Sequence, residues 1–298
     1  MFTKLNLYRL STTILTTTAT ITFYPFDIHA EESSSSKSWS SSIKLPNSEL
    51  NSSKKLFNGT TLDGWNGKIG SHWNVINQTI VGQSLGGKPN GAPRASTYLI
   101  TESSHKSFRL LLEAKITGDS SVHTGVAMLG QIYPFKNETS SYQGHLVMIH
   151  DAREPEKNNS DWGLFELMRR NWKTGSVSGN WCPNGGRASS KELCEMAARQ
   201  QTDGWHRIEI LVMENHIQLG LNGVQILDYM DPNPEILQKG PIGLQLHWLN
   251  ENDERNQRVA FRGLVIVDNP EVCELLTVNK DKVKNEEWVQ TYRRRHNI

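Results

Sequence analysis

The sequence has almost no excess of charge of either sign. Its 298 residues include 32 Lys and Arg and 31 Asp and Glu, which gives a formal net charge of +1. Binding to nucleic acid or to an anionic membrane surface as a main task needs a strong basic excess, because both partners are polyanions. The balanced charge therefore argues against these two classes of partner.

Long apolar runs are also missing. No stretch of 18 or more apolar residues occurs, so the sequence predicts no ordinary transmembrane helix. The 9 Trp, 8 Phe and 7 Tyr residues argue against a wholly disordered chain. The length allows about two average domains, or one large β domain with extensions.

Cysteine is scarce, with three residues in the chain: Cys182, Cys194 and Cys273. No Cys-x-x-Cys pair is present, and no spacing of histidines or carboxylates approaches a metal-ligand signature, so the sequence predicts neither a metal site nor another cofactor. Isolated carboxylates and histidines leave binding of a divalent metal open. In an oxidising compartment Cys182 and Cys194 would form a disulfide around a short loop and leave Cys273 free, whereas in a reducing compartment all three would be thiols.

The first 30 residues have the order of a secretory signal peptide. Lys4 and Arg9 give a positive start, residues 10–26 carry no charge, and Ala30 offers a small residue at the cleavage site. Threonines weaken the apolar region, so a disordered tail and an organelle transit peptide stay as alternatives. This interpretation predicts a secreted protein, periplasmic or extracellular.

The two ends of the remaining chain differ in composition from its middle. Residues 31–53 contain 11 serines in 23 positions, too little apolar surface to offset the entropy of ordering, which predicts a flexible linker. Residues 269–298 are polar and charged, and we expect a helical or frayed extension there. We expect the remaining residues, 54–268, to form one domain.

Within that domain the dominant pattern is the β-strand. Apolar side chains occupy every second position of residues 108–116, and Arg109, Glu113 and Lys115 occupy positions between them, the alternation of a half-buried strand. Asn222-Gly223 separates two β-prone runs and predicts a hairpin turn. Further runs lie at 122–129, 145–150, 163–169, 205–212, 216–221, 224–228, 242–248 and 259–267. With one predicted helix at 189–200, this pattern favours an all-β antiparallel sandwich or jelly roll with a short helical insertion.

Several sequence blocks occur in the order and spacing of one known family. These blocks are LFNGTTLDGW at 56–65, GWHR at 204–207, LNGV at 221–224, GPIGLQLH at 240–247 and FRGL at 261–264. In them, over residues 54–268, the chain resembles the 3-keto-disaccharide hydrolase domain family. The resemblance implies a concanavalin A-like jelly roll, secreted or periplasmic, that cleaves 3-keto-glycosides without a redox cofactor and so takes a small carbohydrate as its partner.

The chemistry that the resemblance implies is elimination followed by hydration. A ketone at C3 acidifies the proton on C2, the oxygen on C1 leaves, and water then adds to the resulting enone-like sugar. Such a site needs a base near C2, a hydrogen-bond donor for the enolate oxygen at C3 and an acid for the leaving oxygen. It does not need the two opposed carboxylates of ordinary glycosidases.

Gln245 and His247 are the strongest candidates for site residues. They lie two positions apart on one predicted strand, so both face the same side of the sheet, and they match the family's Gly-Leu-Gln-x-His pattern. A histidine titrates near neutral pH and suits proton transfer, which predicts a catalytic role for His247. The glutamine would bind sugar hydroxyls or an enolate oxygen. The alternative for both is a solvated polar face.

Glu166 and Arg170 form a second candidate group. Period-2 spacing puts them on one face with Met168 between them, while Arg169 faces away. A carboxylate beside a guanidinium predicts a catalytic base with a clamp for the substrate, to which Arg169 would contribute. The alternative is a cross-strand ion pair of little energetic value.

Three further residues are weaker candidates for substrate binding. His145 follows a Tyr-Gln-Gly sequence, His123 begins a predicted strand, and Trp172 lies among glycines and asparagines, where its ring would stack on a sugar. Core-edge packing is the alternative for the histidines, and buried packing for the tryptophan. Because His145 and His150 are five positions apart, regular pleating puts them on opposite faces.

Two departures from the family's pattern leave catalysis open. The strand at 125–129 lacks an Arg that many members carry at its end, and Leu146 and Met148 stand where many members alternate Glu and Gln. If those polar residues contact the sugar elsewhere in the family, this chain binds differently. A lectin-like carbohydrate-binding module with the same sandwich is therefore the alternative function.

Overall fold

The computed structural model of the protein describes residues 38–84, 96–118, 123–134, 138–150, 165–170, 203–231, 239–247 and 256–278. Two short helical elements, η1 (Trp39–Ser42) and α1 (Asn47–Leu50), precede the strands. Sheet A consists of β1 (Ser53–Lys55), β3 (Trp73–Ile76), β4 (Thr79–Ser84), β6 (Phe108–Ile116), β10 (His206–Met213), β11 (His216–Leu221), β12 (Val224–Met230) and β14 (Gln257–Asp268). Sheet B consists of β2 (Trp65–Asn66), β5 (Thr97–His105), β7 (His123–Ile132), β8 (Tyr142–His150), β9 (Phe165–Arg170) and β13 (Gly240–Leu246).

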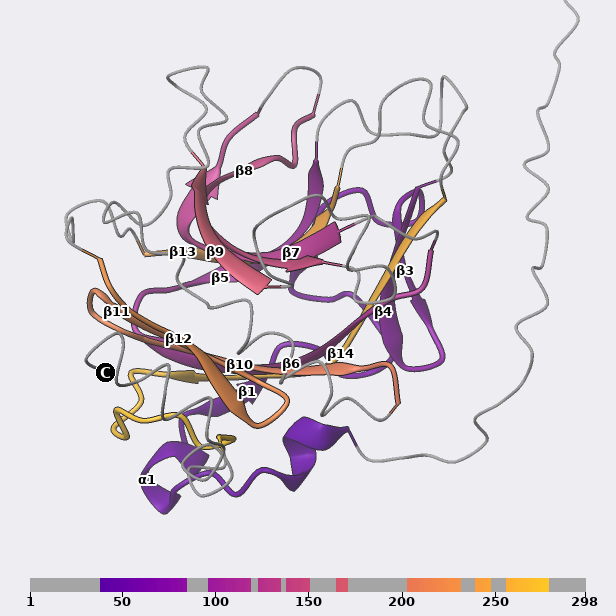
Figure 1. Ribbon diagram of the computed structural model, residues 1–298. Helices are drawn as coiled ribbons and strands as arrows, with labels where there is room; N and C mark the ends of the chain where they lie inside the picture. Colours follow the sequence, from indigo (N-terminus) through magenta and orange to yellow (C-terminus); the bar gives the residue numbers. More distant parts are fainter. Residues whose placement is uncertain are drawn as a thin grey trace, which may run out of the picture. The chain divides into compact units, whose positions relative to one another are not determined.

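All the strand pairs of the two sheets are antiparallel among the described residues. Sheet A has the order β12-β11-β10-β6-β14-β4-β3, with β1 also paired to β14, and sheet B has the order β2-β5-β13-β7-β8-β9. The sheets lie one above the other, and sheet B is the more strongly curved, with its concave face turned away from sheet A (Figure 1). The predicted antiparallel β-sandwich of the jelly-roll class is thus confirmed.

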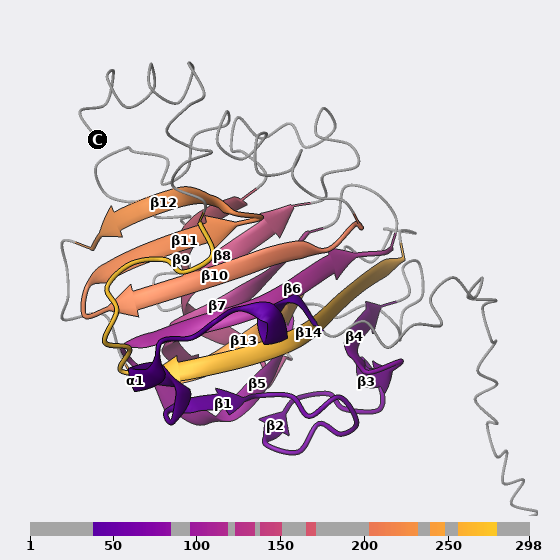
Figure 2. The same cartoon turned by 90° about the horizontal axis from the view of Figure 1, so that it is seen from below.

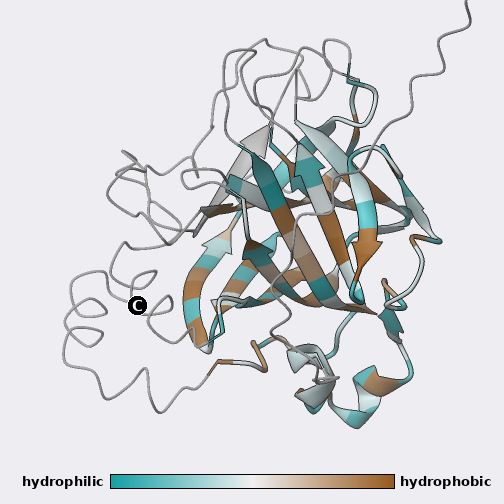
Figure 3. Ribbon diagram, turned by 90° about the vertical axis from the view of Figure 1, so that its right-hand side faces the viewer, coloured by the Kyte–Doolittle hydropathy of each residue, from teal (hydrophilic) through white to brown (hydrophobic). Residues whose placement is uncertain are grey.

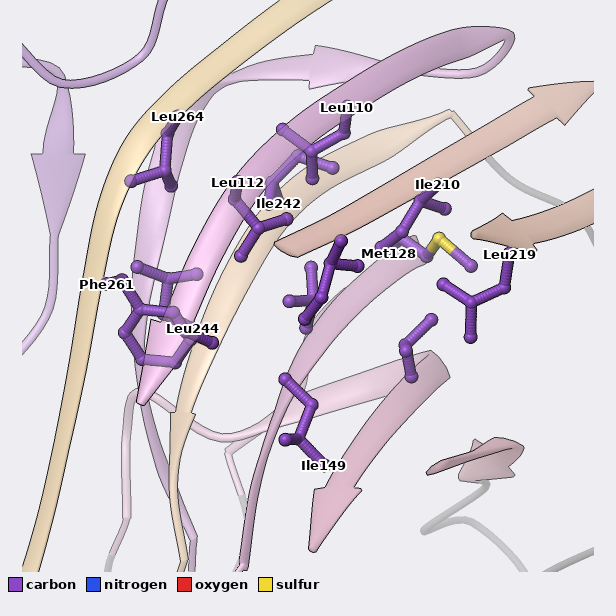
Figure 4. Packing of buried hydrophobic residues seen from close by; sticks show 14 of the residues in the cluster. Leu110, Leu112, Met128, Ile149, Ile210, Leu219, Ile242, Leu244, Phe261 and Leu264 are labelled. Carbon is purple, nitrogen blue, oxygen red and sulfur yellow. The ribbon is translucent and has the colours of Figure 1, made fainter. Parts of the chain in front are cut away.

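One apolar core fills the space between the sheets. Along β6, alternate residues such as Leu110 and Leu112 point into this core, where they meet Ile242 and Leu244 of β13 in sheet B (Figure 4). Hydrophobic and hydrophilic positions alternate along several strands, as the period of a pleated strand requires (Figure 3). Burying each of these leucine or isoleucine side chains contributes about 1.5–3 kcal/mol.

The predicted Asn-Gly hairpin joins β11 and β12. Asn222 and Gly223 both have positive φ angles, of 48° and 87°. Positive φ at both central residues is the requirement of the type I′ turn, whose twist matches that of the flanking strands. The local sequence therefore fixes this turn.

A buried charge cluster ties two chain segments to the outer face of sheet A. The fully buried Arg109 donates from Nε to Glu49 Oε2 of α1 at 3.1 Å and forms an ion pair with Glu209 of β10. The same guanidinium donates to the main-chain oxygens of Val272 (2.8 Å) and Glu274 (3.0 Å), which follow β14. Both segments lie across sheet A in Figure 2.

Part of the serine-rich segment is folded, in contrast to the linker that its composition predicts. Residues 38–53 contain η1, α1 and the start of β1, and the main-chain NH of Trp39 donates to Glu113 Oε2 at 3.0 Å. Composition misses this because the partner that orders the segment, Arg109, lies 60 positions from Glu49. The beginning of the predicted C-terminal extension, residues 269–278, lies on the same sheet.

Other sequence predictions fall outside the described residues. These are the signal peptide at 1–30, the helix at 189–200, and the extension beyond residue 278. In the part of the chain that the structure describes, no helix has both the length and the apolar character needed to span a membrane.

We predict that Arg109→Met lowers the free energy of unfolding by about 3–5 kcal/mol, because it leaves two carboxylates buried without their cation. Unfolding in urea, followed by circular dichroism, measures this loss. The control Arg207→Met removes an ion pair with Asp203 (2.9 Å) whose side chains are 26% and 33% exposed, and it should cost less than about 1 kcal/mol. Equal losses in the two variants would show that Arg109 does not hold the segments.

Candidate functional site

The predicted Gln-x-His pair lies at the end of strand β13, with Gln245 in the strand and His247 directly after it. Its residues Ile242, Leu244 and Leu246 are buried in the core between the sheets. Because side chains alternate along a strand, Gln245 and His247 belong to the opposite, outer face. This face is the concave side of the curved sheet (Figure 1).

Gln245 is fully buried, and one of its side-chain atoms is left without a hydrogen-bond partner among the described residues. Its Nε2 donates to Ser96 Oγ at 3.2 Å and to Tyr98 Oη at 3.1 Å, while its Oε1 has no hydrogen-bond partner among the residues that the structure describes. Its main-chain oxygen accepts a hydrogen bond from Thr124 Oγ1. A buried amide oxygen without a partner costs free energy, so it is an acceptor suited to a hydroxyl of a bound molecule.

A second histidine contacts His247. The register of β13 with β7 pairs Leu244 with Val126, and its continuation brings residue 247 opposite residue 123. The ring centroids of His123 and His247 lie 3.7 Å apart, with the planes inclined at 48°. The main-chain oxygen of His123 accepts a hydrogen bond from Gln257 Nε2 of β14 at 2.9 Å.

The register of β7, β8 and β9 extends the same face. Met148 of β8 stands opposite Gly125 of β7 on one side and Glu166 of β9 on the other. Gly144 stands opposite Arg170. Residues directly opposite each other share a face, so the backbone places Glu166 and Arg170 on the face of Gln245.

A small apolar cluster lies on this face between the polar groups. It consists of Tyr98, Ile100, Ala127, Tyr142, Leu146 and Met148. The ring centroids of Tyr98 and Tyr142 are 5.9 Å apart. Burial raises the pKa of Tyr142, so its phenol stays protonated and donates to the main-chain oxygen of Pro241 at 2.8 Å. Its hydroxyl also accepts a hydrogen bond from the main-chain NH of Gly130 at 3.1 Å, so this side chain links β7 to β13.

His145 lies away from this group. It stands opposite Met128 and Arg169 in register, and its buried Nε2 lies 3.0 Å from Asp231 Oδ2 at the end of β12. Met128 belongs to the core between the sheets, so His145 and Arg169 share the inner face. The substrate contact predicted for His145 does not fit this position, whereas core-edge packing does.

The structure does not describe the remaining predicted site residues. Trp172 and the predicted Cys182–Cys194 disulfide lie outside the described residues. Cys273 is an exposed free thiol. Within the described ranges, no group of three or more His, Cys, Asp or Glu residues is arranged to hold a metal ion.

Comparison with known proteins gives a family match. The model of the 3-keto-alpha-glucoside-1,2-lyase-like domain matches residues 52–267. No curated protein matches the sequence.

Similar solved structures include a candidate glycosyl hydrolase of Parabacteroides distasonis ATCC 8503. It is 16% identical, with a TM-score of 0.45, and the match covers 76% of this chain and 98% of that one. A carbohydrate-binding module of Bacillus subtilis is 11% identical, with a TM-score of 0.43 and coverage of 72% and 100%. The carbohydrate recognition domain of Emp47p is 11% identical, with a TM-score of 0.45 and coverage of 76% and 99%.

We predict that Gln245→Met lowers the free energy of unfolding by about 1–2 kcal/mol, because the loss of the donor to Ser96 and Tyr98 is partly offset by removal of the unpaired buried oxygen. Thermal denaturation measures this. The neighbouring core variant Leu244→Ala should cost about 2–5 kcal/mol. If Gln245→Met were as destabilising as Leu244→Ala, the amide would serve the fold and not a ligand.

Proposed function

The chain belongs to the 3-keto-alpha-glucoside-1,2-lyase-like domain family, and on this basis we propose that it cleaves 3-keto-glycosides at the outer face of sheet B. The net reaction is hydrolysis, reached by elimination and then hydration. The observation that carries the proposal is the juxtaposition of a buried amide oxygen without a partner, on Gln245, with His247 on the same face.

Each part of the reaction has a candidate residue. His247 takes the proton from C2, which the neighbouring ketone has made acidic. Gln245 accepts a hydrogen bond from a sugar hydroxyl at its unpaired Oε1 and so orients the ring. Both hydrogens of its Nε2 are donated to Ser96 and Tyr98, which leaves the enolate oxygen at C3 to another donor.

Arg170 and Glu166 supply the remaining groups. Both stand on the Gln245 face by register. A guanidinium is permanently charged and presents several donors, which suits an oxygen that becomes negative at C3. The carboxyl group of Glu166 gives its proton to the oxygen that leaves C1, and the resulting carboxylate then activates the water that adds to C1. None of these steps requires a redox cofactor.

A lectin-like module is the second candidate function. Leu146 and Met148 are buried in the apolar cluster of the outer face, at positions where many family members carry polar residues. Apolar side chains at these positions supply no group for proton transfer, which favours binding without turnover. Binding on a glycan array, without turnover of any 3-keto-glycoside, would support this function instead.

We predict that the purified protein releases the aglycone from a 3-keto-glucoside without added cofactor, and not from the unoxidised glucoside, whose C2 proton is not acidic. His247→Gln should slow release by about 10²–10⁴-fold, the usual contribution of a general base. Chromatography of the released aglycone measures both. His216→Gln, in sheet A, is the matched control and should keep full activity. No release above the buffer rate over several linkages would refute the proposal.

We also propose that residues 1–30 direct secretion and are then removed. Lys4, Arg9 and the uncharged segment 10–26 support this. N-terminal sequencing of the protein from the medium or periplasm of a secreting host should give a chain that begins after Ala30. Retention of Met1 in the cytoplasmic fraction would argue for a disordered tail.

A further inference from the structure

A serine, a histidine and an aspartate meet at the end of β5 that is remote from Gln245. The hydroxyl of Ser103 lies 2.9 Å from Nε2 of His105, two positions further along the same strand. The other ring nitrogen of His105, Nδ1, lies 2.6 Å from Oδ1 of Asp268 at the end of β14. A serine beside a histidine that a carboxylate orients is the geometry by which serine nucleophiles are recognised, whatever the fold.

The carboxylate of Asp268 determines which nitrogen of His105 carries the hydrogen. Partial burial acts to raise the pKa of Asp268, but the hydrogen bond from His105 and the charge of Lys54, 3.3 Å away, hold this pKa below its usual value. An ionised carboxylate only accepts hydrogen bonds, so Nδ1 of His105 donates to it. In the neutral imidazole Nε2 is then an acceptor, and it faces the hydroxyl of Ser103. The proton of this serine therefore has a base within reach.

The histidine is packed in place, whereas the serine is open to solvent. His105 is 3% exposed, and its ring packs edge-on against Phe108, with 6.3 Å between the ring centroids. Ser103 is exposed. A molecule from solution can therefore reach the hydroxyl without displacing the base.

A bulge in β5 sets the direction of Ser103. The register of β5 with β13 shifts here, and residues 101–103 stand opposite Ile242 alone. Thr101 Oγ1 accepts a hydrogen bond from the main-chain NH of Ile242 at 2.9 Å and donates one to the main-chain oxygen of Ser103 at 2.8 Å. These two bonds hold the bulge in one conformation. Bulges occur next to active sites, where they redirect a side chain.

We propose that Ser103 is the nucleophile of a second site, separate from the proposed sugar site, and that this site hydrolyses esters of small acyl groups. Its neighbours Glu102, Ser104 and Lys106 are polar and exposed, which suits a short acyl group better than a long apolar chain.

The reaction has two balanced steps. Ser103 Oγ attacks the acyl carbon while His105 Nε2 takes the hydroxyl proton, the C–O bond of the ester breaks, and the leaving oxygen takes that proton from His105. Water then attacks the acyl-serine while His105 takes one of its protons. The bond from the acyl group to Ser103 breaks, the acid is released, and the proton returns to Ser103 Oγ.

Labelling of the full chain with a fluorophosphonate tests the nucleophile, because this probe phosphonylates an activated serine with loss of fluoride. We expect one adduct, located at Ser103 by mass spectrometry of peptides, and release of 4-nitrophenol from 4-nitrophenyl acetate above the buffer rate. Ser103→Ala should abolish both the adduct and this excess release. Ser104→Ala, which removes a neighbouring exposed hydroxyl, should leave both unchanged. Absence of the adduct at Ser103, or of release that depends on Ser103, would overturn the inference.

Asp268 is a positioning residue and has a test of its own. In Asp268→Asn the amide oxygen stays with Lys54, so the amide nitrogen faces Nδ1 of His105, moves the ring hydrogen to Nε2 and removes the base. The rate of labelling should fall by about 10²–10⁴-fold. Lys54→Met removes the other partner of Asp268 and should label at nearly the wild-type rate. Both variants should keep a thermal midpoint close to that of the wild type, because the Lys54–Asp268 pair is partly exposed. Equal labelling rates in the wild type and Asp268→Asn would show that the three residues only join the two sheets, and would overturn the inference.

Discussion

The two faces of strand β13 couple the core of this protein to its candidate site. Ile242, Leu244 and Leu246 are buried between the sheets, and their burial fixes the register of the strand. Because side chains alternate along a strand, Gln245 and His247 then lie on the outer face. A slip of one residue would bury the amide in the core and expose the leucines. The residues that would meet a sugar are thus held by the same contacts that stabilise the sandwich.

The neighbouring strands β5 and β7 supply residues that surround Gln245 and His247. On one side Tyr98 of β5 and Ser96, which precedes it, supply the hydroxyls that bind the Gln245 amide, and on the other β7 supplies the ring that contacts His247. Between them Gly125 leaves the face without a side chain. A Cβ there would lie 2.7 Å from both Leu146 Cδ1 and the main-chain oxygen of Val147, so a larger residue would displace the paired strand. Polar groups therefore lie around the apolar cluster of the outer face.

Local sequence predicts the elements of this fold well, because their signals lie within a few residues. The strand at residues 108–116 and the Asn222-Gly223 turn both match the structure. The expectation that this strand is half-buried was wrong, because Arg109 and Glu113 on its other face are buried as well. Contacts between distant segments could not be predicted. Arg109 meets Glu49 across 60 positions, so serine content alone favoured a linker. His123 meets His247 because β13 pairs with β7, and strand order has no local signal. Alternation along β8 did not tell that His145 faces the core.

The central claim is that a 3-keto sugar binds on the outer face of sheet B with its C2 hydrogen beside His247. The most direct measurement is a crystal structure with a 3-keto-glucoside analogue whose glycosidic oxygen is replaced by a methylene group, so that it cannot leave. The account predicts a sugar hydroxyl on Gln245 Oε1, with C2 turned toward His247. A sugar bound against sheet A, or on sheet B with C2 turned away from His247, would contradict it.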